Sequence, residues 1–196
     1  MGGDGRELCL MPLTNSPPTR FDMPMAIYAL GTLVPTIHPD AFVHPEAVII
    51  GDVTVGAESS IWPGSVLRGD HGRIVVGEQT SIQDGSIIHC TKEHHTLIGS
   101  RCVVGHNAHI EGATIEDDVL IGSGSVLLHR VVVHSRALVA AGAVLINDTI
   151  VPNHALAMGV PAKIREGAVE DGAFDWNVQM YVHNARWYKQ DLRRLD

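Results

Sequence analysis

The chain has 196 residues, enough for one domain with a sizeable core, and its composition does not require a second domain. Its 14 basic and 22 acidic residues give a formal charge of −8, and no basic cluster could neutralise phosphates, so we expect no nucleic acid partner. The apolar runs fall well short of the roughly 20 residues that span a bilayer, so we expect no membrane segment. Cys9, Cys90 and Cys102 are too few for a disulfide framework, which indicates a reducing, cytoplasmic setting.

The chain begins with a segment, residues 1–24, that mixes Gly, Pro and charged side chains and lacks the apolar region of a signal peptide. We expect this leader to be disordered, with the folded unit starting near residue 25. The predicted boundaries are therefore a leader over 1–24, a repeat domain over 25–165 and a C-terminal segment over 166–196.

The central region is a hexapeptide repeat. An aliphatic residue returns at almost every sixth position from Ile37 to Val151, usually with Ala, Ser or Thr two positions before it and often with Gly after it. This pattern is typical of a parallel β-helix, in which each hexad supplies one short strand and one corner, and three hexads close a triangular coil. We therefore predict a mainly β fold, a parallel β-helix whose aliphatic residues point inward. The spacing does not set the hand of the coil.

The tail changes character after residue 165. Residues 170–195 place Trp176, Met180, Val182 and then Ala185 to Trp187 at roughly helical spacing, followed by basic residues. We predict a C-terminal α-helix that packs on the outside of the β-helix or on a neighbouring copy.

Stacking converts sequence spacing into distance. Because a coil takes about 18 residues, positions one coil apart should lie about one strand spacing, ~4.8 Å, from each other. From Leu67 to Ile88 is 21 residues, a coil plus an insert at residues 71–73. From Ile88 to Ile110 is 22 residues, a coil plus an insert at residues 92–97. These three aliphatic residues should therefore stack on one another.

The residue after each of these aliphatic residues points outward, since strand side chains alternate. These outward residues form a predicted surface column of Arg68, His89 and Glu111. His109 lies on the same side of the same strand as Glu111, whereas His106 sits at the adjoining corner, where it can face the column of a neighbouring copy. Two imidazoles with a third ligand and an open position for water form the catalytic type of zinc centre. The residues leave two readings open: metal ligands, or structural hydrogen bonds with an ion pair between Arg68 and Asp70.

Four segments resemble the γ-class carbonic anhydrase family and its relatives among bacterial hexapeptide-repeat proteins: IGDVTVGAESSIWPGSVLRGD, IVVGEQTSIQDGSIIHC, IGSRCVVGHNAHIEGATIEDDVLIGSGSV and MGVPAKIR. The resemblance spans residues 37–165, and the RGD, QDG plus His, and GH segments follow the family's order and spacing. It implies a left-handed β-helix and a homotrimer that holds Zn²⁺, or alternatively Fe²⁺ or Co²⁺, between subunits.

The resemblance also implies a ligand set. His89, after QDG, and His106, after VG, match the family's first two histidine ligands. The family's third histidine falls at position 111, where this chain has Glu111. Either Glu111 itself or His109 therefore completes the set, and in the second case Glu111 serves as a proton acceptor or supports the ligands.

Three further positions match residues that act around the family's metal. Arg68 and Asp70 correspond to the pair that organises the site across the interface, and Gln83 to the residue that hydrogen-bonds the metal-bound hydroxide or bicarbonate. Asp84 is expected to orient its turn or to pair with an arginine. The implied catalytic residues are thus Gln83, Arg68, Asp70 and Glu111.

The implied reaction is the reversible hydration of carbon dioxide to bicarbonate, in which the metal lowers the pKa of bound water from ~15.7 towards ~7. An exposed histidine near the mouth, His71, His94 or His95, would then carry the released proton. Two alternatives stay open. Many hexapeptide-repeat β-helices are CoA-dependent acyltransferases with a catalytic histidine in a protruding loop, and others are metal-binding scaffold trimers, labelled siderophore-binding, with little or no catalysis.

Overall fold

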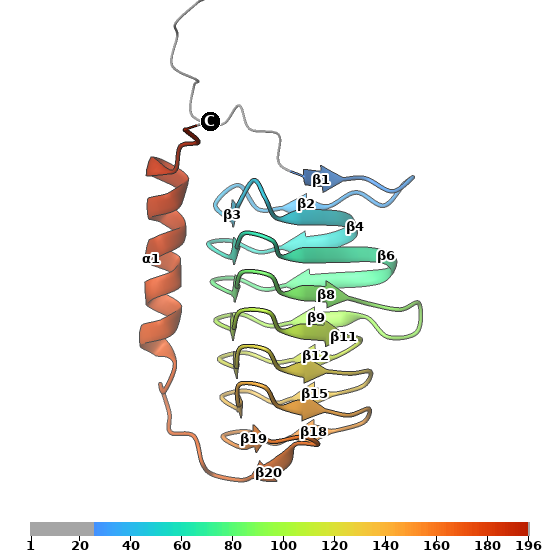
Figure 1. Ribbon diagram of the computed structural model, residues 1–196, viewed down its shortest axis with the longest axis vertical. Coiled ribbons are helices and arrows are strands. Elements are labelled where there is room, and N and C mark those ends of the chain that lie inside the picture. The colour runs from blue at the N-terminus through green and yellow to red at the C-terminus, as the bar shows by residue number, and fades with distance from the viewer. Residues whose placement is uncertain (1–25, 196) are drawn as a thin grey trace, which may run out of the picture.

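The computed structural model describes residues 26–195 and confirms the predicted fold, a left-handed parallel β-helix of about seven coils with one C-terminal helix (Figure 1). The predicted leader, residues 1–24, lies outside the described residues. Each coil stacks on the one before it, so strands about one coil apart in the sequence pair with each other. The coil has three sides, two formed by a large sheet and one by a small sheet.

The large sheet has 12 strands and bends around one corner of the coil, because the long strands β4 and β6 run through that corner. Its strands are β1 (Ala26–Tyr28), β2 (Thr36–Ile37), β4 (Val48–Val55), β6 (Val66–Val76), β8 (Ile87–His89), β9 (Thr96–Ile98), β11 (His109–Glu111), β12 (Thr114–Ile115), β14 (Val126–Leu127), β15 (Val132–Val133), β17 (Val144–Leu145) and β18 (Ile150–Val151). We call the side formed by β8, β11, β14 and β17 with residues 48–50 and 66–68 the β8 face. The side with β2, β9, β12, β15 and β18 is the β9 face.

The small sheet forms the third side of the coil and has 8 strands. They are β3 (Phe42–Val43), β5 (Ser60–Ile61), β7 (Ser81–Ile82), β10 (Val103–Val104), β13 (Leu120–Ile121), β16 (Leu138–Val139), β19 (Leu156–Met158) and β20 (Lys163–Arg165). All pairs in it are parallel except the last, since β20 folds back antiparallel on β19 and closes this end of the sheet.

The strand register confirms the predicted stacking. Leu67 pairs with Ile88, Ile88 with Ile110, and Ile110 with Leu127, and all four side chains are fully buried. The other hexad aliphatic residues from Val43 onward are also buried in one continuous core, whereas Ile37, near the end of the stack, is partly buried. Full burial of each such side chain stabilises the fold by ~1.5–3 kcal/mol, which explains why spacing alone specifies the coil.

The helix α1 (Asp175–Asp191) runs beside the small sheet, back along the stack of coils (Figure 1). Its buried residues are Val178, Val182 and Ala185. On the sheet side Phe42 and Trp62 pack against Tyr181 and Tyr188, with ring centroids of Trp62 and Tyr188 at 5.0 Å. Trp176 and Trp187, which contribute to the helical spacing, are 71% and 53% exposed, so they point away from the coil. No helix within residues 26–195 is long and apolar enough to cross a membrane.

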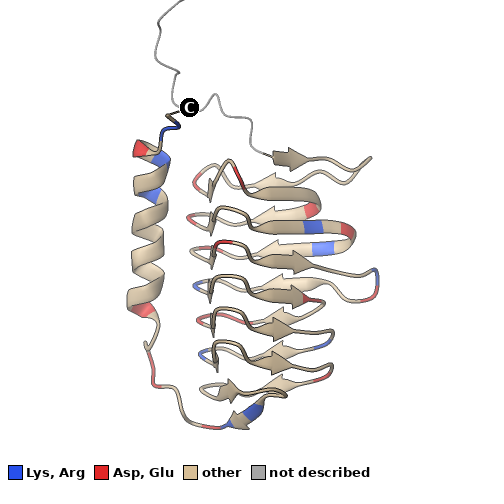
Figure 2. Ribbon diagram, viewed as in Figure 1, with Lys and Arg blue, Asp and Glu red and all other residues tan. Residues whose placement is uncertain are grey.

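Ion pairs at both ends of α1 hold it on the coil. Arg101 pairs with Asp175 at the start of the helix, and Arg186 pairs with Glu58 near its end. Figure 2 shows that many charged residues lie at the turns of the coil and on the helix, and that β6 also carries charged residues. Two of them, Arg68 and Asp70, lie where polar side chains gather at the β8 face.

Candidate functional site

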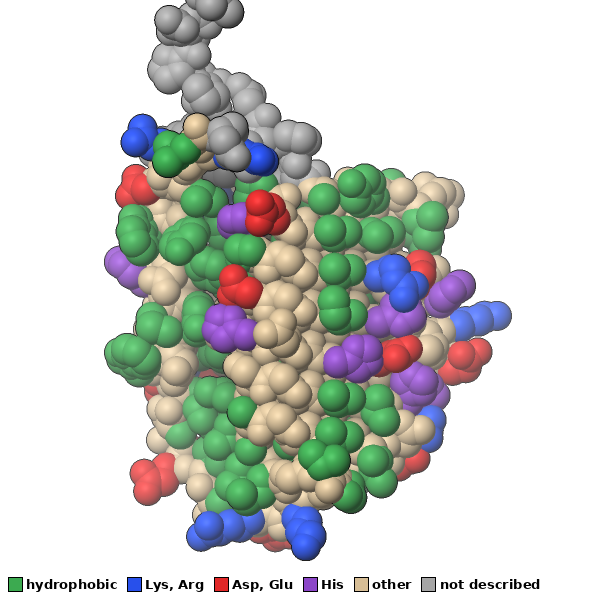
Figure 3. Space-filling model, in the orientation of Figure 1, with side chains coloured by type: hydrophobic (Ala, Val, Ile, Leu, Met, Phe, Trp, Pro, Cys, Tyr) green, Lys and Arg blue, Asp and Glu red, His purple; other side chains and the backbone are tan. Residues whose placement is uncertain are grey.

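The predicted column of polar side chains stands on the β8 face, where β8 and β11 end and β6 runs on towards the corner of the coil. The register pairs Arg68 with His89, and His89 with Glu111. His109 is on the same face, with its Nε2 atom 3.6 Å from Oε2 of Glu111. Figure 3 shows histidine, basic and acidic side chains gathered here, with apolar side chains above and below them. Spacing and strand alternation therefore located this cluster.

His89 lies between two carboxylates. Its Nδ1 atom is 3.0 Å from Oε1 of Glu111, and its Nε2 atom is 3.0 Å from Oδ1 of Asp70. The side chain is only 16% exposed, and contacts at both nitrogens fix the orientation of the ring. The partner of one ring nitrogen decides which nitrogen carries the proton. A proton on Nδ1 facing Glu111 leaves Nε2 able to accept a second one whenever Asp70 moves aside.

The two carboxylates are held in their ionised form. Burial alone would raise the pKa of Asp70, but hydrogen bonds from His89 and Arg68 outweigh it and hold that pKa below its ordinary value. Burial would likewise raise the pKa of Glu111, and hydrogen bonds from His89 and His129 lower it. Both groups therefore carry negative charge at neutral pH.

His129 is a member of the cluster that the sequence reasoning missed. Its Nε2 atom is 3.5 Å from Oε1 of Glu111, and its ring lies against that of His94, with centroids 5.4 Å apart. His94 also contacts Arg130, Nε2 to Nη1, at 3.1 Å. The stacking could have indicated this residue. Leu127 pairs with Ile110, so the next two residues lie on the adjacent coil beside Glu111 and Gly112, and His129 is the second of them.

The remaining predicted residues lie at the other edge of the β8 face, at the corner that joins it to the small sheet. Nδ1 of His106 is 2.9 Å from Oδ2 of Asp84. Asp84, which was expected to orient its turn or to pair with an arginine, pairs with His106 and not with an arginine, because the two residues occupy one corner in successive coils. Gln83 is 4% exposed and follows β7, one coil from Trp62. One chain thus brings Arg68, Asp70, His89, His109 and Glu111 together, but not Gln83 or His106.

The predicted metal ligands do not form a complete set within one chain. Among residues 26–195, no three His, Cys, Asp or Glu side chains are placed to hold a metal ion. Imidazole and carboxylate donors suit Zn²⁺, so the residue types fit such an ion. The set of His89, His106 and Glu111 nevertheless needs a second copy, and a bond to His89 would require one of its two carboxylate partners to move.

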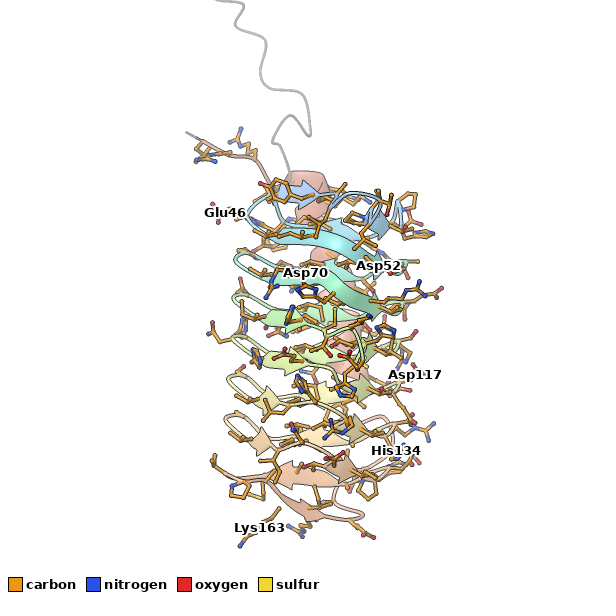
Figure 4. The ribbon with its side chains drawn as sticks, turned by 90° about the vertical axis from the view of Figure 1, so that its right-hand side faces the viewer. Glu46, Asp52, Asp70, Asp117, His134 and Lys163 are labelled. Atoms are coloured by element: carbon orange, nitrogen blue, oxygen red, sulfur yellow. The ribbon has the colours of Figure 1, made fainter. Side chains whose placement is uncertain are left out.

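A cavity of about 270 Å³ opens beside the column. It is lined by Leu33, Asp52, Asp70, His71, Gly72, Arg73 and His95. Arg73 donates from Nε to Asp52 at 3.2 Å, and its backbone N–H donates to Nδ1 of His95 at 3.0 Å. Figure 4 labels Asp52 and Asp70 on neighbouring coils of this side. A ligand in the cavity would therefore touch the carboxylate that contacts Nε2 of His89.

Comparisons with known proteins point to a transferase family. The chain matches the family described as bacterial transferase hexapeptide (six repeats) over residues 35–69 and 112–147. It is 40% identical over 147 residues to carnitine operon protein CaiE of Escherichia coli strain K12, covering 75% of each chain. It is 37% identical over 181 residues to CaiE of Escherichia coli O6:K15:H31, covering 88% of this chain and 92% of the relative.

Two solved structures have the same architecture. A Bacillus cereus protein provisionally assigned as an acetyltransferase shares 31% identity at a TM-score of 0.80, over 83% of this chain and 96% of that one. A hexapeptide transferase family protein from Anaplasma phagocytophilum shares 33% identity at a TM-score of 0.78, over 84% and 98%. These comparisons do not confirm the resemblance to γ-class carbonic anhydrases, and they support the acyltransferase alternative better.

Proposed function

Because this chain belongs to the bacterial hexapeptide-repeat transferase family, we propose that it is an acyltransferase that moves an acyl group from a thioester such as acyl-CoA to a hydroxyl or amine. The observation that carries the proposal is the pair of His89 and Glu111, 3.0 Å apart, on an open face of the coil. A histidine whose ring is oriented by a carboxylate is the usual base that activates an acceptor for attack on an acyl group.

The proton path follows from the contacts of His89. Nδ1–H donates to Glu111, and Nε2 accepts the proton of the acceptor as its oxygen or nitrogen attacks the thioester carbonyl carbon. A carbon–oxygen or carbon–nitrogen bond forms, the carbon–sulfur bond breaks, and the proton passes from His89 to the departing thiolate. The negative charge of Glu111 stabilises the imidazolium formed between these steps. Asp70 must leave Nε2 for the acceptor to enter, and its ion pair with Arg68 retains it nearby.

The acting unit in this proposal is a homotrimer. Hexapeptide-repeat proteins commonly form trimers. The β8 face carries exposed aliphatic side chains beside the polar column and further along the stack, including Ile87, 40% exposed, and Ile146, 54% exposed. Contiguous apolar surface rimmed by polar groups marks an interface. In the trimer this surface packs against a neighbour, and the corner with His106 and Gln83 approaches the column of the adjacent copy.

A second candidate is the metal-dependent hydration of carbon dioxide to bicarbonate. The clustering of His89, His109 and Glu111 on one face favours it, because these are donors that Zn²⁺, Fe²⁺ or Co²⁺ accepts. His89 with Glu111 or His109, and His106 from a second copy, would hold the ion. Such an ion would supply Lewis-acid activation of water at neutral pH. Gln83 lies near His106, so it would reach the ion from that second copy.

The two candidates are separated by an acyl transfer assay on protein treated with a chelator. Acetyl-CoA is supplied with a panel of amines and alcohols, CoA thiol release is followed with a thiol reagent, and products are identified by mass spectrometry. We expect release that depends on the acceptor, survives chelation, and falls by about 10²-fold or more in His89→Asn. The matched control is His134→Asn, since Nδ1 of His134 is 2.9 Å from Oε1 of Glu116 on the β9 side. Carbon dioxide hydration lost on chelation, without acyl transfer, would favour the second candidate.

A further inference from the structure

A buried hydroxyl joins the two strand ends that carry His89 and Glu111. Thr96, the first residue of β9, is fully buried. Its Oγ1 atom donates a hydrogen bond to the carbonyl oxygen of His89 and accepts one from the backbone N–H of Gly112 at 2.9 Å. We propose that Thr96 is a positioning residue that sets the separation of His89 and Glu111. Its catalytic consequence rests on the proposed acyltransferase function.

The position of Thr96 explains why these strand ends need support. The pairing of β8 with β11 ends at His89 and Glu111, the last pair of its ladder. Beyond it the chain leaves the sheet, into the inserted loop after His89 and into a turn at Gly112. The hydroxyl supplies one hydrogen bond to each departing strand, and buried backbone groups require such partners. Thr96 thereby links the two strands just beyond their last pair, His89 and Glu111.

The inserted loop packs tightly against the same place. Gly112 has φ +64°, and a Cβ atom there would lie 2.7 Å from Cβ of His94. The bond from Thr96 to His89 spans seven residues and closes the base of the loop that carries His94. Thr96 therefore fixes the loop and both strand ends together.

Thr80 makes the same pair of hydrogen bonds far from the column. Its Oγ1 atom donates to the carbonyl of Gly99 at 2.8 Å and accepts the N–H of Cys102 at 3.1 Å, and the residue is 1% exposed. Neither partner adjoins a residue of the column. The hydroxyl also makes a longer contact of 3.4 Å with the carbonyl of Glu78. Thr80 is therefore a control that makes the same two hydrogen bonds at similar burial but has no link to His89.

The expected catalytic effect follows from the geometry of the base. Nδ1 of His89 and Oε1 of Glu111 are 3.0 Å apart, so a shift of either backbone lengthens the bond that orients the ring. A misplacement of about 1 Å costs about 10²-fold in rate, and a smaller shift after loss of the hydroxyl should cost about tenfold.

The experiment compares Thr96→Val, Thr96→Ser and Thr80→Val in the full chain. The readouts are kcat and KM for acyl transfer and the NMR signal of the His89 Nδ1 proton, identified by its loss in His89→Asn. We expect Thr96→Val to lower kcat about tenfold with little change in KM and to shift the His89 signal. Thr96→Ser should restore both readouts. Thr80→Val should leave both at the wild-type values while lowering Tm as much as Thr96→Val does.

Equal losses of kcat in Thr80→Val and Thr96→Val, or an unshifted His89 signal in Thr96→Val, would overturn the proposal. If Thr96→Val does not fold, Thr96→Ala, which removes the hydroxyl without adding a methyl group, takes its place. If the wild-type protein shows no acyl transfer, the proposed function fails, and the NMR signal still decides whether Thr96 positions His89.

Discussion

The small sheet and the β8 face are built from the same hexads but present different outer surfaces. On the small sheet, the outward side chains of Phe42, Trp62 and Val103 are buried beneath α1. On the β8 face, Ile87 stays exposed beside the charged column and Ile146 stays exposed further along the stack, among residues 26–195. Inward aliphatic residues make all three sides of the coil alike, so the outward residues decide what covers each side. The chain covers one side itself, and in our proposal it leaves another for a partner and a substrate.

The largest expected effect tests the covered side. Trp62 is 7% exposed, and its Nε1–H donates to the hydroxyls of Ser60 and Ser81, each at 3.0 Å. Trp62→Ala should lower the free energy of unfolding by about 3–5 kcal/mol, because it opens a cavity under α1. Urea unfolding followed by circular dichroism measures the change.

The control for Trp62 is Leu97 on the β9 face, which is 39% exposed. Leu97→Ala should cost about 1 kcal/mol or less, because little apolar area is lost from the interior. Equal destabilisation by the two substitutions would remove the distinction between covered and open sides.

A second test addresses the column on the open side. Glu111→Gln removes the charge that stabilises the imidazolium of His89, so kcat for acyl transfer should fall by about 10²-fold. Glu116→Gln is the matched control, since Glu116 also contacts a histidine Nδ1 atom but stands on the β9 side. Steady-state kinetics measure both, and similar rates in the two variants would show that Glu111 has no special role.

A third test asks whether the open side is covered by other copies. Ile87→Asp places a charge in the apolar surface of the β8 face and should cost about 1–3 kcal/mol per interface, enough to shift trimers towards monomers. Sedimentation velocity measures the mass, and far-ultraviolet circular dichroism should stay unchanged. Leu97→Asp, on the β9 face, should remain trimeric. A wild-type protein that sediments as a monomer would contradict the proposed assembly.

The smallest effect concerns pH. The folded state lowers the pKa of Asp70, so its ionised form stabilises the fold above the ordinary carboxylate pKa of about 4, and this contribution disappears as pH falls through the lowered value. Solvent screening limits the contribution to about 1 kcal/mol. Asp70→Asn should therefore be less stable than the wild type at pH 7, and the difference should shrink in acid. A difference that grows as pH falls would contradict the assigned pairing.

The coil and the column could be predicted because both depend on spacing. Leu67, Ile88 and Ile110 point inward and stack on one another. The inserted loops between them change their spacing in the sequence but not their place in the stack. Strand alternation then places His89 and Glu111 one above the other on the surface. These steps use backbone geometry alone.

Other features depend on side-chain contacts that spacing does not encode. The pairing of His106 with Asp84 depends on how two turns place their side chains. Thr96 points inward like an aliphatic residue, so no surface pattern marks it. The exposure of Trp176 depends on which helix face meets Trp62 and Phe42, residues more than a hundred positions earlier. The repeat therefore predicts the coil, whereas these features depend on side-chain contacts that the repeat does not specify.

The most direct test of the central claim is a crystal structure with a non-reactive acyl-CoA analogue and an acceptor. We expect the acyl carbonyl carbon and the acceptor atom beside Nε2 of His89 on the β8 face, with Asp70 displaced and Glu111 still bonded to Nδ1. An analogue bound away from the β8 face, or one that leaves His89 between its two carboxylates, would contradict the assignment of His89 as the base.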